Sequence, residues 1–411
     1  MNKTNMIKIV TILTMVTIAL TLTTAASDDW QQFQKNETKI GMSSASAIVS
    51  SPTTTWNLTL NDFYAAPIAH GGFVYANNQG GLHKYYYNGT IAPDGWPATA
   101  VNSLYGSPAY GDGTGRIFAY GASRTIKGVN ESNSSDVWSA TPPVAAHEFM
   151  SEITYAINKS STKSIYFGDG QYGNHFYCYD VGGADFVLRW NYTPAGGQFW
   201  AGASVMGDYV LFGNESAYVT CLHESNGTYV DSIYIGTGQN QPHIRSSISW
   251  NATNATYGHI FFTNCQGFSG GSGYVWKVGF NTTTGQFNDA DKTHSDAIYR
   301  TTTTPVVYNG RVYAGDYPAF SGGYVYCLNE SDLTDEIWTC SVGGAVQSSP
   351  ALAKRDGHVY IYITRNYVNG GVVCINDTGS IEWADTTVGS YSMQGVAIAE
   401  NETGTWVFAT S

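Results

Sequence analysis

The sequence predicts an all-β protein, an eight-bladed β-propeller of four-stranded antiparallel blades. Three observations support this prediction: 30 Tyr and 46 Gly among 411 residues, a strand core that recurs along the chain, and no stretch with helical periodicity. Aromatic residues favour strands, and glycine and asparagine favour turns. A repeat of about 40 to 50 residues is typical of propellers and arrays.

The recurring unit is built around a strand core rich in aromatic residues. One equivalent position can be chosen in each of the eight copies, and successive positions are 43 to 52 residues apart: Tyr75, Phe118, Tyr166, Leu211, Phe261, Tyr313, Tyr360 and Phe408. Small residues and a turn precede this strand, and the turn is often Asn-Gly or Asp-Gly, which favours a hairpin. A third strand follows, and most units end on a strand with a tryptophan, at Trp138, Trp190, Trp338 and Trp383. Four strands per unit, repeated radially, are the blades of a propeller.

The last unit, QGVAIAENETGTWVFATS at 394–411, lacks its fourth strand. Near the start of the chain, TTTWNLTL at 53–60 is a tryptophan strand with no blade before it. We expect this N-terminal strand to complete the eighth blade and close the ring, which leaves no open edge. The alternative is seven blades plus a hairpin.

The N-terminal residues predict export. Residues 1–26 have two lysines, an apolar run at 9–22 and a small-residue cleavage site, which is the pattern of a signal peptide. An uncleaved anchor is the alternative, because the 18 residues from 9 to 26 are at the short limit for a membrane span. Residues 27–52 form a lead-in segment and 53–411 the propeller. We expect an extracellular or cell-surface protein, with no membrane span in the mature chain.

Charge and sequons narrow the class of partner. The net charge is −12 with only 19 Lys and Arg, which argues against a nucleic-acid partner. Asn-X-Ser/Thr occurs 15 times after residue 26, which suggests a glycosylated surface protein. Accidental sequons in Asn- and Thr-rich turns are the alternative reading for some of them. The expected glycosylation sites are Asn57, Asn88, Asn130, Asn191, Asn226, Asn254, Asn281, Asn329 and Asn376; the remaining sequons are Asn36, Asn133, Asn158, Asn214, Asn251 and Asn401.

Two stretches carry a resemblance to a known family. TTPVVYNGRVYAGD…GGYVYCLNESDLTDEIW at 303–338 and the lead-in DWQQFQKNETKIGMSS at 29–44 resemble the pyrroloquinoline-quinone-like propeller repeat. The family includes quinone-dependent dehydrogenases, a scaffold lipoprotein of outer-membrane assembly, and exported proteins without catalytic residues. The resemblance is therefore specific for fold and weak for function. The sequon-dense composition is also similar to that of archaeal cell-envelope proteins.

The six cysteines do not indicate a metal site. Four lie on third strands, where we expect small buried hydrophobic residues: Cys178, Cys221, Cys327 and Cys374. Folding the hairpin about residues 333 and 334 places Cys327 opposite Cys340, so a cross-strand disulfide is possible in an exported protein. Cys265 has no evident partner, and no cysteine or histidine spacing fits zinc.

Residues just before the first strand of each blade are expected to rim one mouth of the central channel, where ligands of propellers usually sit. These candidate binding residues are Tyr64, Tyr105, Glu148, Trp200, His243, Arg245, Arg300, Gln347 and Tyr391. His243 and Arg245 are two apart, so they share a face of a strand. Such a ring could hold a carbohydrate, a peptide or an anion. The alternative is that it only plugs and hydrates the channel.

We therefore expect a non-catalytic binding or scaffold module at the cell surface, with cell-envelope proteins or glycans as partners and no cofactor. The first alternative is an oxidoreductase that uses pyrroloquinoline quinone with calcium, which the resemblance allows. Calcium needs several carboxylate and amide oxygens, and Glu148 is the only obvious acid at the rim. The second alternative is a purely structural component of the envelope.

Overall fold

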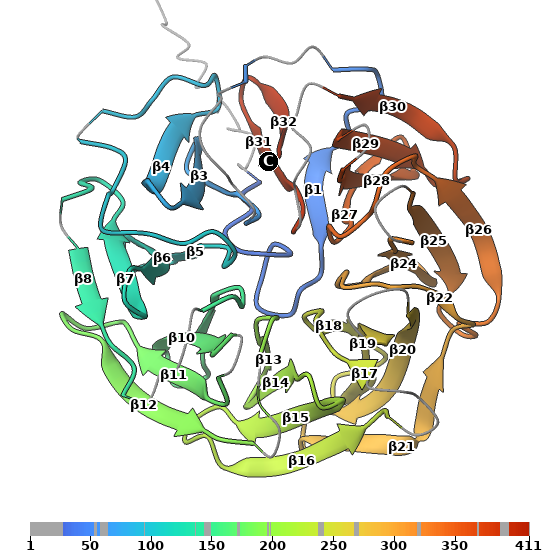
Figure 1. The fold of residues 1–411 in the computed structure, drawn as a ribbon, viewed down its shortest axis with the longest axis horizontal. Helices are drawn as coiled ribbons and strands as arrows, with labels where there is room; N and C mark the ends of the chain where they lie inside the picture. Colours follow the sequence, from blue (N-terminus) through green and yellow to red (C-terminus); the bar gives the residue numbers. More distant parts are fainter. Residues whose placement is uncertain are drawn as a thin grey trace, which may run out of the picture.

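The computed structural model describes residues 28–52, 56–57, 65–93, 95–135, 137–143, 149–170, 173–194, 197, 199–236, 242–266, 271–318, 322–367, 370–386 and 394–410. All regular structure in these ranges is β-strand. The sheets stand around a central axis like the blades of a wheel, in chain order (Figure 1). The predicted signal peptide lies outside the described residues. In the described part of the chain, no helix is long and apolar enough to cross a membrane.

Within the described ranges, seven sheets of three or more strands form the blades. The first three blades contain β2 (Ile68–His70), β3 (Phe73–Asn78) and β4 (Gly81–Tyr86); β5 (Ala109–Gly111), β6 (Arg116–Gly121), β7 (Thr125–Asn130) and β8 (Val137–Ala140); and β9 (Thr154–Ile157), β10 (Lys163–Gly168), β11 (Phe176–Asp180) and β12 (Val187–Tyr192). The next two contain β13 (Ser204–Met206), β14 (Tyr209–Gly213), β15 (Tyr218–His223) and β16 (Tyr229–Tyr234); and β17 (Pro242–His243), β18 (Ser249–Ala252), β19 (Tyr257–Gln266), β20 (Ser272–Asn281), β21 (Gln286–His294) and β22 (Ile298–Tyr299). The last two contain β23 (Val306–Tyr308), β24 (Arg311–Gly315), β25 (Tyr324–Asn329) and β26 (Glu336–Ser341); and β27 (Ala351–Arg355), β28 (His358–Arg365), β29 (Gly371–Asn376) and β30 (Ile381–Asp385) with β1 (Met42–Ser46) added.

The prediction of eight four-stranded blades is wrong. The eighth repeat unit is only a two-stranded hairpin, β31 (Ala397–Asn401) and β32 (Gly404–Phe408), in the described part of the chain. This hairpin stands between the first and the seventh blade (Figure 1). The architecture is therefore the alternative, seven blades plus a hairpin. The repeat count gave too many blades because an aromatic strand core indicates only a hairpin. It does not show whether two further strands follow to complete a four-stranded sheet.

The strand expected to close the ring, 53–60, lies mostly outside the described residues. Trp56 is described, and it docks on the first blade. Its Nε1 donates to the carbonyl oxygen of Tyr87 at 2.8 Å, and its ring lies 5.9 Å from Tyr85 and 6.3 Å from Phe408. Trp56 thus joins the first blade to the terminal hairpin, although no strand is assigned to it.

The recurring phrase is a packing unit that links neighbouring blades. In the third, sixth and seventh blades a central-strand cysteine pairs with a tyrosine on one side and a tryptophan on the other, as in Tyr313, Cys327 and Trp338. The Trp338 Nε1 donates to the Asp377 carbonyl of the next blade at 3.1 Å. A Cβ on Gly379 would lie 2.9 Å from the Trp338 ring, so glycine is required there. In the seventh blade the equivalent tyrosine is Tyr362, two residues after the predicted Tyr360.

The possible disulfide between Cys327 and Cys340 is absent. Both thiols are free and buried. Cys327 pairs with Trp338, and Cys340 pairs with Val325, so the two cysteines are out of register by two residues. The hairpin turns about Asp332, with Leu328 opposite Glu336 and Asn329 bonded to Asp335, and not between residues 333 and 334 as the symmetric folding assumed.

The lead-in segment fills the central channel. It runs through the middle of the ring in dark blue (Figure 1). Its backbone forms hydrogen bonds with inner strands of successive sheets, at Ala69, Tyr110, Val205, Trp250 and Leu352. The Gln32 side chain bonds to both the N–H and the carbonyl of Tyr155, and β1 pairs in parallel with β27. The chain therefore uses its own N-terminal residues as the core of the ring.

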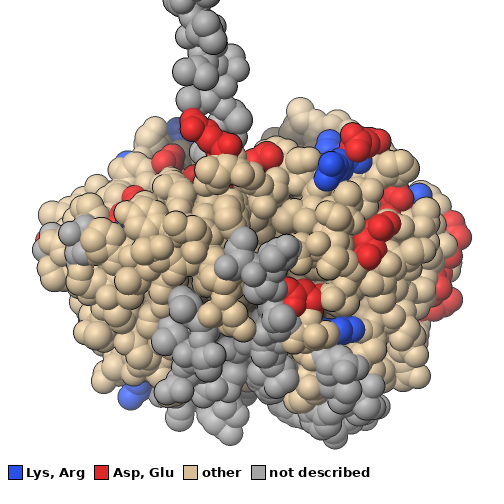
Figure 2. Space-filling view, turned by 90° about the horizontal axis from the view of Figure 1, so that it is seen from above, with Lys and Arg blue, Asp and Glu red and all other residues tan. Residues whose placement is uncertain are grey.

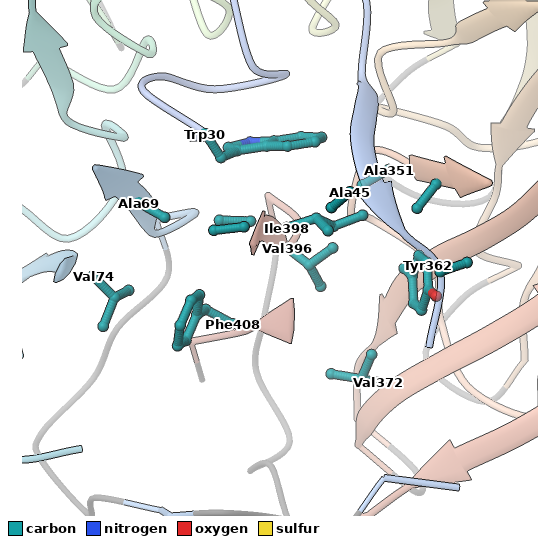
Figure 3. Packing of buried hydrophobic residues seen from close by; sticks show 14 of the residues in the cluster. Trp30, Ala45, Ala69, Val74, Ala351, Tyr362, Val372, Val396, Ile398 and Phe408 are labelled. Carbon is teal, nitrogen blue, oxygen red and sulfur yellow. The ribbon is translucent and has the colours of Figure 1, made fainter. Parts of the chain in front are cut away.

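The hydrophobic core beside this plug joins the two ends of the propeller. Trp30 is 1% exposed and lies between Ala69 of the first blade and Ala45 of β1 (Figure 3). Residues of the seventh blade and of the terminal hairpin, among them Tyr362 and Phe408, complete the cluster. Burying this apolar surface stabilises ring closure, because each large buried side chain contributes about 1.5 to 3 kcal/mol.

One charged side chain of the plug is fully buried. Lys39 Nζ donates to Thr154 Oγ1 at 3.0 Å. Burial lowers the pKa of Lys39, and the nearby carboxylates of Glu152 and Glu37 oppose this shift. Burial also raises the pKa of Glu152, which accepts a hydrogen bond from Ser247. The channel axis thus holds a polar connection between plug and ring.

A belt of hydrogen bonds runs around the channel just before the inner strands. Ser107 Oγ accepts from the Ala66 N–H, Thr304 Oγ1 from the Ser247 N–H, and Ser349 Oγ from the Thr304 N–H, each at 2.8 to 3.0 Å. This explains the small residues that open each repeat unit, because only short side chains can bridge adjacent blades at the axis.

On the side of the ring seen in Figure 2, charged residues occur in small groups on a mainly uncharged surface.

Candidate binding surface at the channel mouth

Two kinds of segment meet at the mouth where the inner strands begin. One is the segment before each inner strand, as the sequence predicted. The other is the turn between the second and third strands, because neighbouring antiparallel strands alternate in direction. Residues on these turns were missed in the sequence, where they read as ordinary turn residues. Glu215, Tyr317 and Arg124 are three residues on such turns, between β14 and β15, β24 and β25, and β6 and β7.

A compact group of polar and aromatic side chains forms one side of the mouth. We call it the Trp200 cluster, and it consists of Trp200, Glu215, His243, Arg245, Arg300 and Tyr317. The Arg245 guanidinium lies 4.5 Å from the Trp200 ring centroid, in cation–π contact. Two guanidinium nitrogens of Arg245 bind the two carboxylate oxygens of Glu215, one of them at 3.0 Å. This fork geometry is the strongest form of an arginine–carboxylate pair.

Glu215 is also held by His243. The His243 Nδ1 lies 3.1 Å from Glu215 Oε2 and 2.9 Å from the Glu215 carbonyl oxygen. Burial would raise the pKa of Glu215, but the hydrogen bonds and charges of His243 and Arg245 outweigh it and hold the pKa below its ordinary value. Glu215 therefore stays ionised, and the charge of Arg245 is neutralised inside the protein.

The second arginine of the Trp200 cluster stacks on a tyrosine. The Arg300 guanidinium lies 5.1 Å from the Tyr317 ring centroid. Burial raises the pKa of Tyr317 to about 12, although the positive charges of Arg300 and Arg245 oppose the shift. The same two arginines act on the thiol of Cys265, whose pKa burial also raises. Arg245 and Arg300 therefore act on the same two side chains, Tyr317 and Cys265.

The remaining predicted residues are distributed differently. Gln347 accepts a hydrogen bond from Asn366 at 2.8 Å, and its side chain is also in hydrogen-bond contact with Tyr317 of the Trp200 cluster. Tyr105 lies elsewhere at the mouth, and its carbonyl oxygen accepts a bond from the Gln394 side chain. Tyr64, Glu148 and Tyr391 lie outside the described residues. The structure therefore brings together five of the nine predicted residues: Trp200, His243, Arg245, Arg300 and, through Tyr317, Gln347.

Buried carboxylates near the mouth are separated from one another. Asp169 contacts His175 and Tyr177, whereas Asp316 accepts bonds from two backbone N–H groups and the Tyr326 hydroxyl. Burial raises the pKa of Asp316 to about 6. Within the described ranges, no three His, Cys, Asp or Glu side chains are grouped so that they could hold a metal ion.

The sequons form turns of one kind. The Oδ1 atom of the asparagine accepts the N–H of the residue two positions later in twelve of them: Asn36, Asn88, Asn130, Asn133, Asn158, Asn214, Asn226, Asn254, Asn281, Asn329, Asn376 and Asn401. In many of them the Ser or Thr hydroxyl also bonds to Oδ1. This is the Asx-turn, which asparagine favours for local reasons. Turn chemistry alone therefore accounts for much of the sequon density.

Comparisons with known proteins identify the fold. No family model and no curated protein sequence matches the chain. A europium-containing methanol dehydrogenase superposes with a TM-score of 0.68 at 13% identity, covering 92% of this chain and 89% of that one. A quinohemoprotein alcohol dehydrogenase from Pseudomonas putida HK5 gives 0.61 at 11% identity, covering 93% and 75%. BamB from Moraxella catarrhalis gives 0.57 at 14% identity, covering 86% and 98%.

These similarities confirm the β-propeller fold. The structures that share it include dehydrogenases and BamB, so the fold alone does not define a function.

Proposed function

We propose that this protein is an exported, glycosylated propeller that acts as a non-catalytic binding or scaffold module at the cell surface. Envelope proteins or glycans are its partners. The family that the repeat resembles includes a scaffold lipoprotein of outer-membrane assembly, which offers a precedent for this role. The observation that carries the proposal is the Trp200 cluster.

The Trp200 cluster suits binding because its ion pair holds the aromatic ring of Trp200 in a fixed position. Glu215 holds Arg245, and Arg245 braces the partly exposed Trp200 ring. A tryptophan held in this way presents a large rigid face and loses little conformational entropy on binding, which is why Trp and Arg are frequent in binding hot spots. The plug behind the mouth adds to this rigidity, since it ties inner strands from several blades together.

The main alternative is a quinone-dependent oxidoreductase. Trp200 could stack on a flat cofactor, and arginines suit its carboxylates. However, Arg245 is already paired with Glu215 in two-point contact, and the described residues lack a grouped set of ligands for calcium. The described residues of the mouth therefore favour the binding role, and we place this alternative second.

Removing the Trp200 ring tests the proposal. We expect the purified chain to bind immobilised envelope polysaccharides or envelope proteins of its source organism, and Trp200→Ala to abolish this binding without changing the melting temperature. Trp138→Ala is the matched control, because Trp138 also stacks on an arginine, Arg116 at 3.8 Å, but lies on the outer strand β8. Binding that survives Trp200→Ala, or is lost equally in Trp138→Ala, would contradict the assignment.

A further inference from the structure

A cavity of about 530 Å³ opens at the mouth over the second blade, away from the Trp200 cluster. Its volume is within the range of small-molecule sites. Its lining comes from the β3–β4 turn, the segment that enters the second blade, the β6–β7 turn and the segment before β9: Gln79, Asn102, Ser103, Leu104, Tyr105, Tyr120, Gly121, Ala122, Ser123, Arg124 and Phe149.

The floor of this cavity is aromatic and fixed. The rings of Tyr120 and Phe149 stack with centroids 4.9 Å apart, and both side chains are buried. The Tyr120 hydroxyl donates to the Ser151 carbonyl oxygen at 3.0 Å, which anchors the ring. Asn77 Nδ2 donates to the Ser103 carbonyl oxygen at 3.0 Å and holds the wall segment in place. The cavity is therefore preformed.

The rim contains a strained turn. Ser123 and Arg124 connect β6 to β7 with φ angles of 58° and 60°. Left-handed conformations are unfavourable for residues other than glycine, and glycine or asparagine usually occupies them in short hairpins. Strain of this kind is concentrated at ligand sites. Here it places a guanidinium and a hydroxyl at the edge of the cavity.

The lining has a consistent chemistry. The amides of Gln79 and Asn102 and the hydroxyls of two serines can both donate and accept hydrogen bonds. The described lining includes one cation, Arg124, and no carboxylate, in a chain with 31 Asp and Glu. Arginine recognises carboxylates in two-point contact. Aromatic walls with amide and hydroxyl groups fit a hydroxylated ring, and the guanidinium fits an acid group attached to it.

We propose that this cavity binds a carboxylated sugar, such as the uronic acid unit of an acidic polysaccharide. The ring packs against the aromatic floor, the amides and serine hydroxyls bond its hydroxyl groups, and Arg124 binds the carboxylate. This is a second site on the mouth face, and it goes beyond the function proposed for the Trp200 cluster.

Calorimetric titration of the full chain with glucuronate, glucose and propionate tests this inference. Glucuronate has both features, whereas each of the other probes lacks one. We expect glucuronate to bind most tightly, and Arg124→Gly to weaken it by about tenfold or more, because hydrogen bonds to charged groups contribute about 1.5 to 3 kcal/mol. Glycine accepts the positive φ, so this variant should fold at least as well as the natural chain.

Arg355→Ala is the matched control. Arg355 is the last residue of β27, which begins at the mouth, so it lies at the end of the seventh blade opposite the mouth. It should leave glucuronate binding unchanged. Three outcomes would overturn the inference: no detectable glucuronate binding, equal affinity in the natural chain and Arg124→Gly, or propionate binding as tight as that of glucuronate.

Discussion

At the scale of single residues, the mouth is defined by the pairing of Glu215 with Arg245. Their side chains are 7% and 8% exposed, so neither charge is solvated. Removing one partner of a buried pair leaves the other charge uncompensated, which costs about 3 to 5 kcal/mol. An intact pair therefore affects the stability of the fold as well as supporting Trp200.

Glu215→Gln should destabilise the protein by about 3 kcal/mol at pH 7 in urea unfolding. The folded-state pKa of Glu215 lies below its ordinary value. Its contribution is therefore complete above the unfolded pKa of about 4.3 and is lost as the pH falls through the folded pKa. The difference between the natural chain and the variant should shrink toward pH 3.

The exposed pair of Asp208 and Lys159 supplies the control. Asp208→Asn should change stability by less than about 0.5 kcal/mol, because exposed ion pairs contribute little. Equal stability of the natural chain and Glu215→Gln at pH 7, or a difference that does not shrink in acid, would contradict the role given to the buried pair.

At the scale of elements, the lead-in depends on one glycine for its packing. Gly41 has φ of +57°, and a Cβ there would lie 2.4 Å from Val306 Cγ2 and 2.1 Å from Gln34 Oε1. Gly310 also has positive φ, at +75°, but a Cβ there meets nothing within 4 Å. The two positions share a positive φ, which alanine tolerates poorly, but only Gly41 is crowded by neighbouring atoms.

The free energy of unfolding should fall by about 1 to 2 kcal/mol in both Gly41→Ala and Gly310→Ala, because alanine is unfavourable in the left-handed backbone conformation. In Gly41→Ala the free energy of unfolding should fall by about a further 1 to 3 kcal/mol, which is the usual cost of overpacking, because the lead-in must shift against β23. Urea unfolding of the two variants measures the difference. Equal losses would mean that the lead-in does not pack in the channel as described.

The turns at the sequons give a prediction about modification. Asn226 is exposed and its Oδ1 accepts the Thr228 N–H and hydroxyl at 3.0 and 2.8 Å, whereas Asn214 is 1% exposed. A glycan on the Nδ2 of Asn226 is compatible with the turn, but one on Asn214 would have to displace packed atoms. Peptide mass mapping of the protein from its natural host should therefore find a glycan at Asn226 and none at Asn214. A glycan at Asn214 in folded protein would contradict this packing.

At the scale of the whole molecule, the sequence predicted the repeat and its packing more reliably than the number of blades. The tyrosine, cysteine and tryptophan positions of the repeat fall on paired strands because local alternation determines which face each residue occupies. The blade count failed because completing a sheet depends on long-range pairing, which one strand core does not reveal. The cysteine register failed because the hairpin turns about Asp332, and the polar residues from 329 to 335 do not show which of them is the centre of the turn.

The candidate site was also only partly predictable. Positions before the inner strands gave Trp200, His243, Arg245 and Arg300, but their partners Glu215 and Tyr317 come from another part of each blade. Antiparallel geometry brings both kinds of segment to one end, so a search that includes the second turn of each blade would have found them. The plug could not be foreseen, since the lead-in has no repeat pattern of its own.

The central claim is that this propeller binds at its mouth without quinone chemistry. Calorimetric titration of the mature chain with pyrroloquinoline quinone, with and without calcium, tests it most directly. We expect no binding in either condition, because Arg245 is already engaged by Glu215. Tight binding that depends on calcium would contradict the account and identify the mouth as an active site.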